Sequence, residues 1–162
     1  MPIIANEIVY RLSGGAANAN ANASLGGAKS STVVPAALFD DVTSAESAAG
    51  DTEYRCIYVH NANGTLTMQN AVLWITANTT ANRIAVGVGS SAVNSTEQTV
   101  ADENTAPTGV TFSQPTTKGA AIALGNIPAG QHRAVWLRRA IAAASAASND
   151  TYSLRVECDT AA

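Results

Sequence analysis

Charged and aromatic residues are scarce in this chain of 162 residues. Asp, Glu, Lys and Arg together make up only 13% of the sequence, roughly half of their usual share in a globular domain, and aromatic residues only 5%. The core must therefore consist mainly of Val, Ile and Leu, and the polar surface of Asn, Ser, Thr and Gly. A surface of this composition is more typical of extracellular or particle-bound β proteins than of cytosolic enzymes.

Basic clusters and long apolar runs are also missing. The net charge is −3, and the densest basic group, Arg133 with Arg138 and Arg139, is too small to neutralise a nucleic-acid backbone. No apolar run approaches the roughly 18 residues that cross a bilayer. The first residues, 1–7, lack the basic start and apolar stretch of a signal peptide. We therefore expect no nucleic-acid or membrane partner, and a protein that is made in a cytoplasm.

Cysteine occurs only twice, at Cys56 and Cys158, and this spacing matches no zinc or redox motif. In a reducing compartment both are expected to be small buried apolar side chains, with a disulfide between neighbouring strands as the alternative. Four Asn-x-Ser/Thr triplets, which we attribute to turns and not to glycosylation, begin at Asn63, Asn78, Asn94 and Asn149.

Alternating apolar and polar residues predict many short strands. The cleanest pattern is 152–158, where Tyr152, Leu154, Val156 and Cys158 share one face. Further strands are expected at 7–12, 32–34, 54–60, 66–68, 71–75, 83–89, 110–113, 121–124 and 131–139. Asn63-Gly64 favours a tight hairpin turn. Their number and spacing predict an all-β fold, an antiparallel β-sandwich with either jelly-roll or immunoglobulin-like topology.

Two segments allow a helix. In 38–50, Thr43 or Ser44 could cap a helical turn that ends at Gly50. The alanine-rich segment 133–148 favours a helix by propensity alone. We predict a strand there instead, because a Pro-Ala-Gly turn at 128–130 leads into a β-rich run.

The N-terminal part predicts a separate feature: a first strand and an arm in 1–31, ahead of a single sandwich domain in 32–162. Two Gly-Gly pairs bracket an Ala/Asn run that offers nothing to anchor in a core. We expect an extended arm, either flexible or ordered only against a neighbouring subunit. Removing 1–27 should then leave a folded domain with weaker attachment. The candidate partner-contact residues are Ser13, Gly14, Gly15, Leu25, Gly26 and Gly27.

The sequence predicts no catalytic, cofactor-binding or metal-binding residues, and hence a protein that is not an enzyme. His60 and His132 lie at strand ends, where a shared site is the alternative to two half-exposed imidazoles. A loop with Asp40-Asp41 could bind a cation if further oxygens came from Asp51, Glu53 or Asp102-Glu103, but no calcium-loop pattern is present. Arg138 and Arg139 should point to opposite faces of a sheet, one lying over Trp136 or pairing with an acid across strands.

Most of the chain is similar to small virion proteins encoded by tailed bacteriophages. The stretches that carry the resemblance are 7–15, 23–27 (Ala-Ser-Leu-Gly-Gly), 37–61, 90–110 and 127–139 (Ile-Pro-Ala-Gly-Gln-His-Arg-Ala-Val-Trp-Leu-Arg-Arg). The resemblance implies a capsid decoration (cement) protein that stabilises the outer capsid surface of the virion. Its partners would be the major capsid protein or other virion proteins, and it would form a trimer or dimer.

Two other functions remain open. One is a tail, baseplate or fibre component of the same kind of particle. The other is a carbohydrate-binding adsorption module, which would need exposed aromatic side chains. Trp74 and Trp136 both lie within apolar strand cores, so we expect them to be buried.

Overall fold

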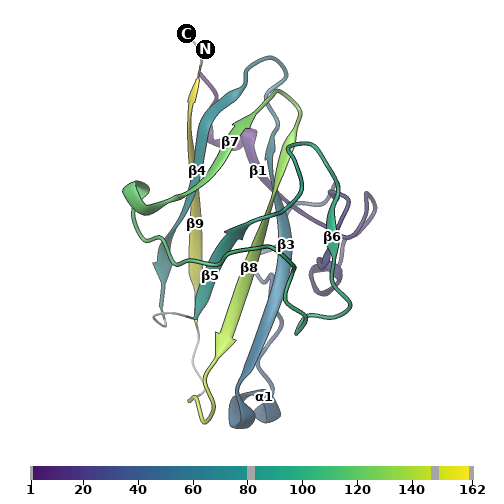
Figure 1. Cartoon of the computed structure of the whole chain (residues 1–162), viewed down its shortest axis with the longest axis vertical. Coiled ribbons are helices and arrows are strands. Elements are labelled where there is room, and N and C mark those ends of the chain that lie inside the picture. The colour runs from purple at the N-terminus through teal and green to yellow at the C-terminus, as the bar shows by residue number, and fades with distance from the viewer. Residues whose placement is uncertain (1, 80–82, 147–149, 161–162) are drawn as a thin grey trace.

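Two antiparallel sheets face one another in the computed structural model, which describes residues 2–79, 83–146 and 150–160 (Figure 1). The first sheet has the order β1 (Ile8–Leu12), β3 (Asp51–Asn61), β8 (His132–Ile141) and β5 (Ile84–Val88). The second has the order β7 (Ile122–Ile127), β4 (Met68–Asn78) and β9 (Tyr152–Thr160). All pairs are antiparallel, so the predicted β-sandwich is confirmed.

The main core fills the space between these sheets. Because successive side chains of a strand point to opposite faces, each strand contributes every second residue to it. The inward-facing core residues of the first sheet include Ile57, Val59, Val86, Val135 and Leu137. Those of the second sheet include Leu73, Ile75, Leu124, Ile127 and Val156.

The turn at Asn63-Gly64 connects the two sheets and does not form the predicted hairpin. β3 pairs with β1 and β8, whereas β4 pairs with β7 and β9. The Asn63 side-chain oxygen accepts hydrogen bonds from the backbone N–H groups of Thr65 (2.9 Å) and Leu66 (2.7 Å). The hairpin prediction is wrong because this side-chain turn lets the chain leave the first sheet and enter the second.

The alanine-rich segment is a strand, as predicted, where β8 pairs with β3 over its full length. Residues 142–146 are not helical, and 147–149, with the triplet at Asn149, lie outside the described residues. The short strands predicted at 32–34 and 110–113 are reduced to isolated bridges, Arg11 with Val33 and Val86 with Ser113.

The predicted helical turn is confirmed as α1 (Ser44–Ala49). Thr43 accepts a hydrogen bond from the Glu46 N–H, and the Glu46 carboxylate accepts one from the Thr43 N–H at 2.6 Å. Gly50 ends the helix with a φ of 80°.

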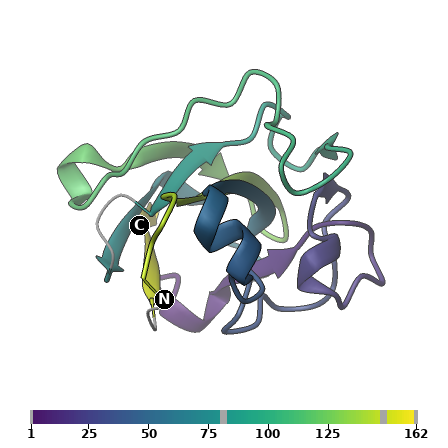
Figure 2. The ribbon, with the colours of Figure 1, turned by 90° about the horizontal axis from the view of Figure 1, so that it is seen from below.

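Single 3₁₀ turns occur at η1 (Ala5–Glu7), η2 (Ala21–Ala23) and η3 (Lys118–Ala120). Figure 2 looks onto the end of the sandwich where α1 lies, and β1 begins and β9 ends at the opposite end (Figure 1).

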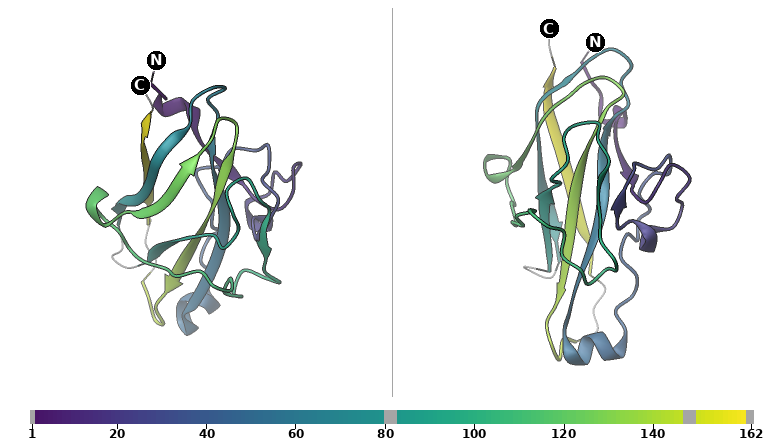
Figure 3. Two further views of the ribbon diagram at one scale, coloured as in Figure 1. Left: turned by 45° about the horizontal axis from the view of Figure 1, so that its top comes forward. Right: turned by 45° about the vertical axis from the view of Figure 1, so that its right-hand side comes forward.

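Residues 13–31 fold back onto the first sheet instead of extending from it. Their strand β2 (Gly26–Gly27) pairs with β6 (Glu97–Thr99), and both lie beside β3 (Figures 1 and 3). A second, smaller core is thereby formed on the outer face of the first sheet by Cys56, Tyr58, Val100, Ala134 and Trp136, with Leu25, Tyr54, Val110 and Phe112 packed against it.

The expectation that nothing in this segment anchors to a core is therefore wrong. A division at residue 31 also does not coincide with a structural boundary, since all of β1 pairs with β3.

Candidate functional site

Three of the six candidate contact residues of the N-terminal segment, Ser13, Leu25 and Gly27, contact the first sheet. Gly14 is exposed, and Gly15 bonds within the segment. Ser13 and Ser24 are fully buried, and both hydroxyls donate to the carbonyl oxygen of Cys56, at 2.9 and 2.6 Å. The Cys56 N–H donates to the carbonyl of Ser24 at 2.7 Å. These bonds extend the backbone pairing of β3 beyond the end of β1. The Gly26 N–H donates to the Ser13 hydroxyl at 3.0 Å.

The glycines of this segment allow close backbone contact. A Cβ on Gly26 would lie 1.8 Å from the carbonyl oxygen of Gln98, and one on Gly14 would lie 2.5 Å from that of Ala23. The Gly15 N–H donates a hydrogen bond to the carbonyl oxygen of Ala28 at 3.0 Å. The Gly-Gly pairs were thus a signal of a tight fold, although the sequence did not indicate onto which surface. Contact of these residues with a partner stays a prediction.

Tyr58 and Glu97 hold the two loops of the outer face together. The Tyr58 hydroxyl donates to the Gly27 carbonyl at 2.5 Å and accepts from the Glu97 N–H at 2.9 Å. The buried Glu97 carboxylate accepts from both the N–H and the hydroxyl of Ser90 and of Ser91. Burial alone would raise the pKa of Glu97, but these hydrogen bonds outweigh it and lower the pKa to about 2. Glu97 therefore acts as a fixed, ionised acceptor.

The two histidines face each other across β3 and β8. His60 and His132 are directly opposite in the strand register. The His132 ring packs edge-on against Tyr58 with 4.8 Å between ring centroids. Burial, together with the nearby Lys29, lowers the pKa of His132 to about 4 and also lowers that of His60. Both imidazoles are therefore neutral at pH 7, and the His60 Nε2 atom lies at hydrogen-bond distance, 3.2 Å, from the Gly130 carbonyl oxygen.

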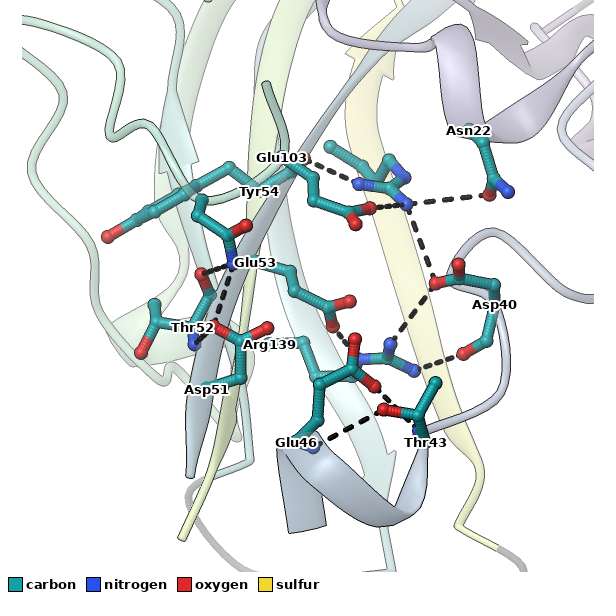
Figure 4. Close-up of polar contacts among 12 residues, drawn as sticks. Asn22, Asp40, Thr43, Glu46, Asp51, Thr52, Glu53, Tyr54, Glu103 and Arg139 are labelled. Carbon is teal, nitrogen blue, oxygen red and sulfur yellow. Dashed lines mark hydrogen bonds and ion pairs between the residues drawn. The ribbon is translucent and has the colours of Figure 1, made fainter. Parts of the chain in front are cut away.

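Ionisable residues gather at the end of the sandwich near α1 (Figure 4). We call Asp40, Glu53, Arg55, Glu103 and Arg139 the ionic cluster. Glu53 lies directly opposite Arg139 in the strand register, and its carboxylate accepts from the Arg139 Nε. Arg139 also donates to the Asp40 carbonyl at 2.6 Å. Arg55, which is fully buried, contacts Glu103 at 2.5 Å and Asp40 at 3.6 Å.

Phe39 lies under both guanidinium groups of the ionic cluster. The distance from its ring centroid is 5.4 Å to Arg55 and 4.8 Å to Arg139.

The prediction that Arg138 and Arg139 point to opposite faces, with one pairing to an acid across strands, is confirmed, since Arg139 pairs with Glu53. Arg138 lies over Phe112 at 5.5 Å and not over Trp136.

The carboxylates proposed from sequence as cation ligands are only partly brought together. Asp40, Glu53 and Glu103 form one group within 4.8 Å, and a second group consists of Glu46, Asp51 and Glu53. Asp41 and Asp102 belong to neither group among the described residues.

Two residues of this region, Arg55 and Glu46, were not indicated by the sequence reasoning. The period-2 pattern held the signal for Arg55, because it shares the inward face with Ile57 and Val59.

Both tryptophans and Cys56 are buried, as predicted, whereas Cys158 is only half-buried. Trp74 is 7% exposed and Trp136 fully buried. Both cysteines are free thiols; Cys56 is buried and Cys158 half-buried, and burial raises the pKa of each. The alternative of a disulfide between them is not formed.

Among the described residues, no helix is long and apolar enough to span a membrane. Comparison of the chain with protein-family models, with curated proteins and with solved structures finds no match.

Proposed function

We propose that this chain is a non-enzymatic structural protein of a tailed-bacteriophage particle that decorates and stabilises the outer capsid surface. The observation that supports this most is the fixing of residues 13–31 and 90–113 onto one sheet face by buried polar groups. Ser13, Ser24, Tyr58 and Glu97 all bond to backbone there. A surface held in one conformation loses little entropy on binding, which suits many identical contacts on a lattice.

The carbohydrate-binding alternative is less well supported. Such a module stacks sugars on exposed aromatic rings, and both tryptophans are buried in this chain. A tail component and a decoration protein can share a β-sandwich fold, so copy number is what distinguishes them.

The proposal is tested by the ratio of this protein to the major capsid protein in purified particles, measured by densitometry or quantitative mass spectrometry. We expect about one copy per capsid subunit or another simple lattice ratio. A ratio of a few hundredths would assign the protein to the tail, and its absence from the particle would refute both assignments.

The edge strand β9 supports self-association of the chain. Among the described residues β9 pairs only with β4, which leaves its other edge without a neighbouring strand. A groove of about 420 Å³ lies between this edge and β1, and it is lined by the charged residues Arg155 and Glu157 as well as by Ile3, Ile8, Tyr10, Leu154, Val156 and Cys158. An unpaired edge beside such a groove is a surface to which another strand can be added.

Charge complementarity indicates a second copy of this chain as the occupant. Arg155 and Glu157 flank Val156 on β9; within the chain they pair with each other at 2.8 Å, and Glu157 also pairs with Lys118 at 2.7 Å. If two β9 strands pair antiparallel about a twofold axis at Val156, each Arg155 faces Glu157 of the second copy. Such opposite-charge pairs stabilise a sheet, whereas like charges in these positions oppose pairing.

Charge exchange tests this dimer. Arg155→Glu should convert the dimer to a monomer, since the introduced carboxylate would face Glu157 of the other copy in both symmetry-related pairs. The double variant Arg155→Glu/Glu157→Arg should restore the dimer. The mass is measured by light scattering after size exclusion at about 10 μM. A monomeric wild type, or a dimer that is unaffected by Arg155→Glu, would contradict the proposed pairing.

A further inference from the structure

Three carboxylates converge where α1 meets β3. Ligand atoms of Glu46, Asp51 and Glu53 lie within 4.8 Å of one another. The chain reverses at Gly50, so that Glu46 on the helix comes to lie beside the first residues of the strand, as Figure 4 shows.

One oxygen of each carboxylate is already occupied. Glu46 Oε2 accepts from the Thr43 N–H (2.6 Å), and Asp51 Oδ1 accepts from the Thr52 N–H and the Asn104 amide (both 2.7 Å). Glu53 Oε2 accepts from Arg139. The second oxygen of each is left for another ligand within the part of the chain that the structure describes.

Glu53 provides an independent indication of a ligand. Its side chain is only 1% exposed, yet its Oε1 atom is buried without a hydrogen-bond partner among the described residues. A buried carboxylate oxygen without a partner is costly, so such atoms are normally paired with a donor or a cation.

The local charge is also unbalanced. The two carboxylate groups together contain five acidic residues: Asp40, Glu46, Asp51, Glu53 and Glu103. Only two basic residues, Arg55 and Arg139, form ion pairs with them among the described residues. Arg55 pairs with Asp40 and Glu103, and Arg139 pairs with Asp40 and Glu53. Among the described residues, no ion pair reaches Glu46 or Asp51, so the excess negative charge lies at the α1–β3 junction.

We propose that Glu46, Asp51 and Glu53 bind a calcium ion that links α1 to the start of β3. Carboxylate oxygens are hard ligands, which favour Ca²⁺ or Mg²⁺ over softer metals. Glu46 and Asp51 are half-exposed, so water can complete a coordination shell of irregular geometry. Calcium accepts such a shell, whereas magnesium requires a near-ideal octahedron. The site stands independently of the proposed virion function, since it concerns only this chain and the ion.

Thermal unfolding of the full chain with and without calcium tests the site. After treatment with EDTA, about 5 mM Ca²⁺ should raise the Tm by roughly 5 °C, as expected for an ion present well above its Kd. The double variant Glu46→Gln/Asp51→Asn should lose this rise. Both substitutions keep the oxygen that accepts the backbone hydrogen bond, so the variant should still fold.

Asp41→Asn is the matched control, because Asp41 lies in the neighbouring loop outside both carboxylate groups. This variant should keep the full calcium response, and isothermal titration with CaCl₂ should give one site per chain for it and for the wild type. No response of the wild type, or an equal response of Glu46→Gln/Asp51→Asn, would overturn the site. An equal rise with Mg²⁺ would overturn its assignment to calcium.

Discussion

Removal of residues 1–27 is expected to abolish cooperative folding of the chain. The deletion removes β1, which pairs with β3 at five positions, and the core residue Leu12. It also removes Ser13, Ser24 and Leu25, which cover the second core beside Cys56. Since a domain is stable by only about 5–15 kcal/mol, the loss of an entire strand with its core contacts exceeds what the fold can tolerate.

Urea unfolding followed by circular dichroism measures this effect. The truncated chain should lack a cooperative transition, and Leu12→Ala in the full chain should cost about 2–5 kcal/mol through the same core. The variant Ala16→Ser is the control, because Ala16 is exposed at the tip of the segment and should change stability by less than about 0.5 kcal/mol. A truncated chain that unfolds cooperatively with the wild-type midpoint would instead support the extended arm expected from the sequence.

Arg139→Met is expected to destabilise the fold by about 3–5 kcal/mol, because it leaves the buried Glu53 carboxylate without its cation. Replacement of both residues, Arg139→Met/Glu53→Leu, should recover much of this loss, since no buried charge is then left unpaired at that position. Equilibrium urea unfolding of the three proteins at pH 7 gives the free energies. If the double variant is no more stable than Arg139→Met, the unpaired carboxylate is not the cause.

The adjacent arginine provides the control for this prediction. Arg138→Met changes the same kind of side chain on the opposite face, where Arg138 lies over Phe112, and should lower the free energy of unfolding by only about 1 kcal/mol.

The pH dependence of the Arg139→Met effect gives a second check. Glu53 has a raised pKa in the folded state, so the folded protein binds a proton more readily than the unfolded one. The penalty of Arg139→Met should therefore be largest at neutral pH and decrease as the pH falls through the pKa of Glu53.

The local features of this protein could be read from its sequence. The alternation in 152–158 predicted β9, and a cap at Thr43 or Ser44 with a stop at Gly50 predicted the limits of α1. The adjacent positions of Arg138 and Arg139 sufficed to place them on opposite faces. Each of these properties depends on residues within one strand or one helical turn, because strand periodicity and helix capping are short-range effects.

The sites depended on contacts between distant segments. Whether Asn63-Gly64 closes a hairpin is decided by which strands β3 and β4 pair with, and the course of 13–31 is decided by a sheet face built from β3 and β8. Likewise Glu53 meets Arg139 only because β3 and β8 pair in this register. The sequence by itself thus determined the strands of the two main sheets, the helix and the sandwich class. The tertiary structure alone decided which loops cover the sheet and which charges are buried together, because sheet pairing joins residues far apart in the chain.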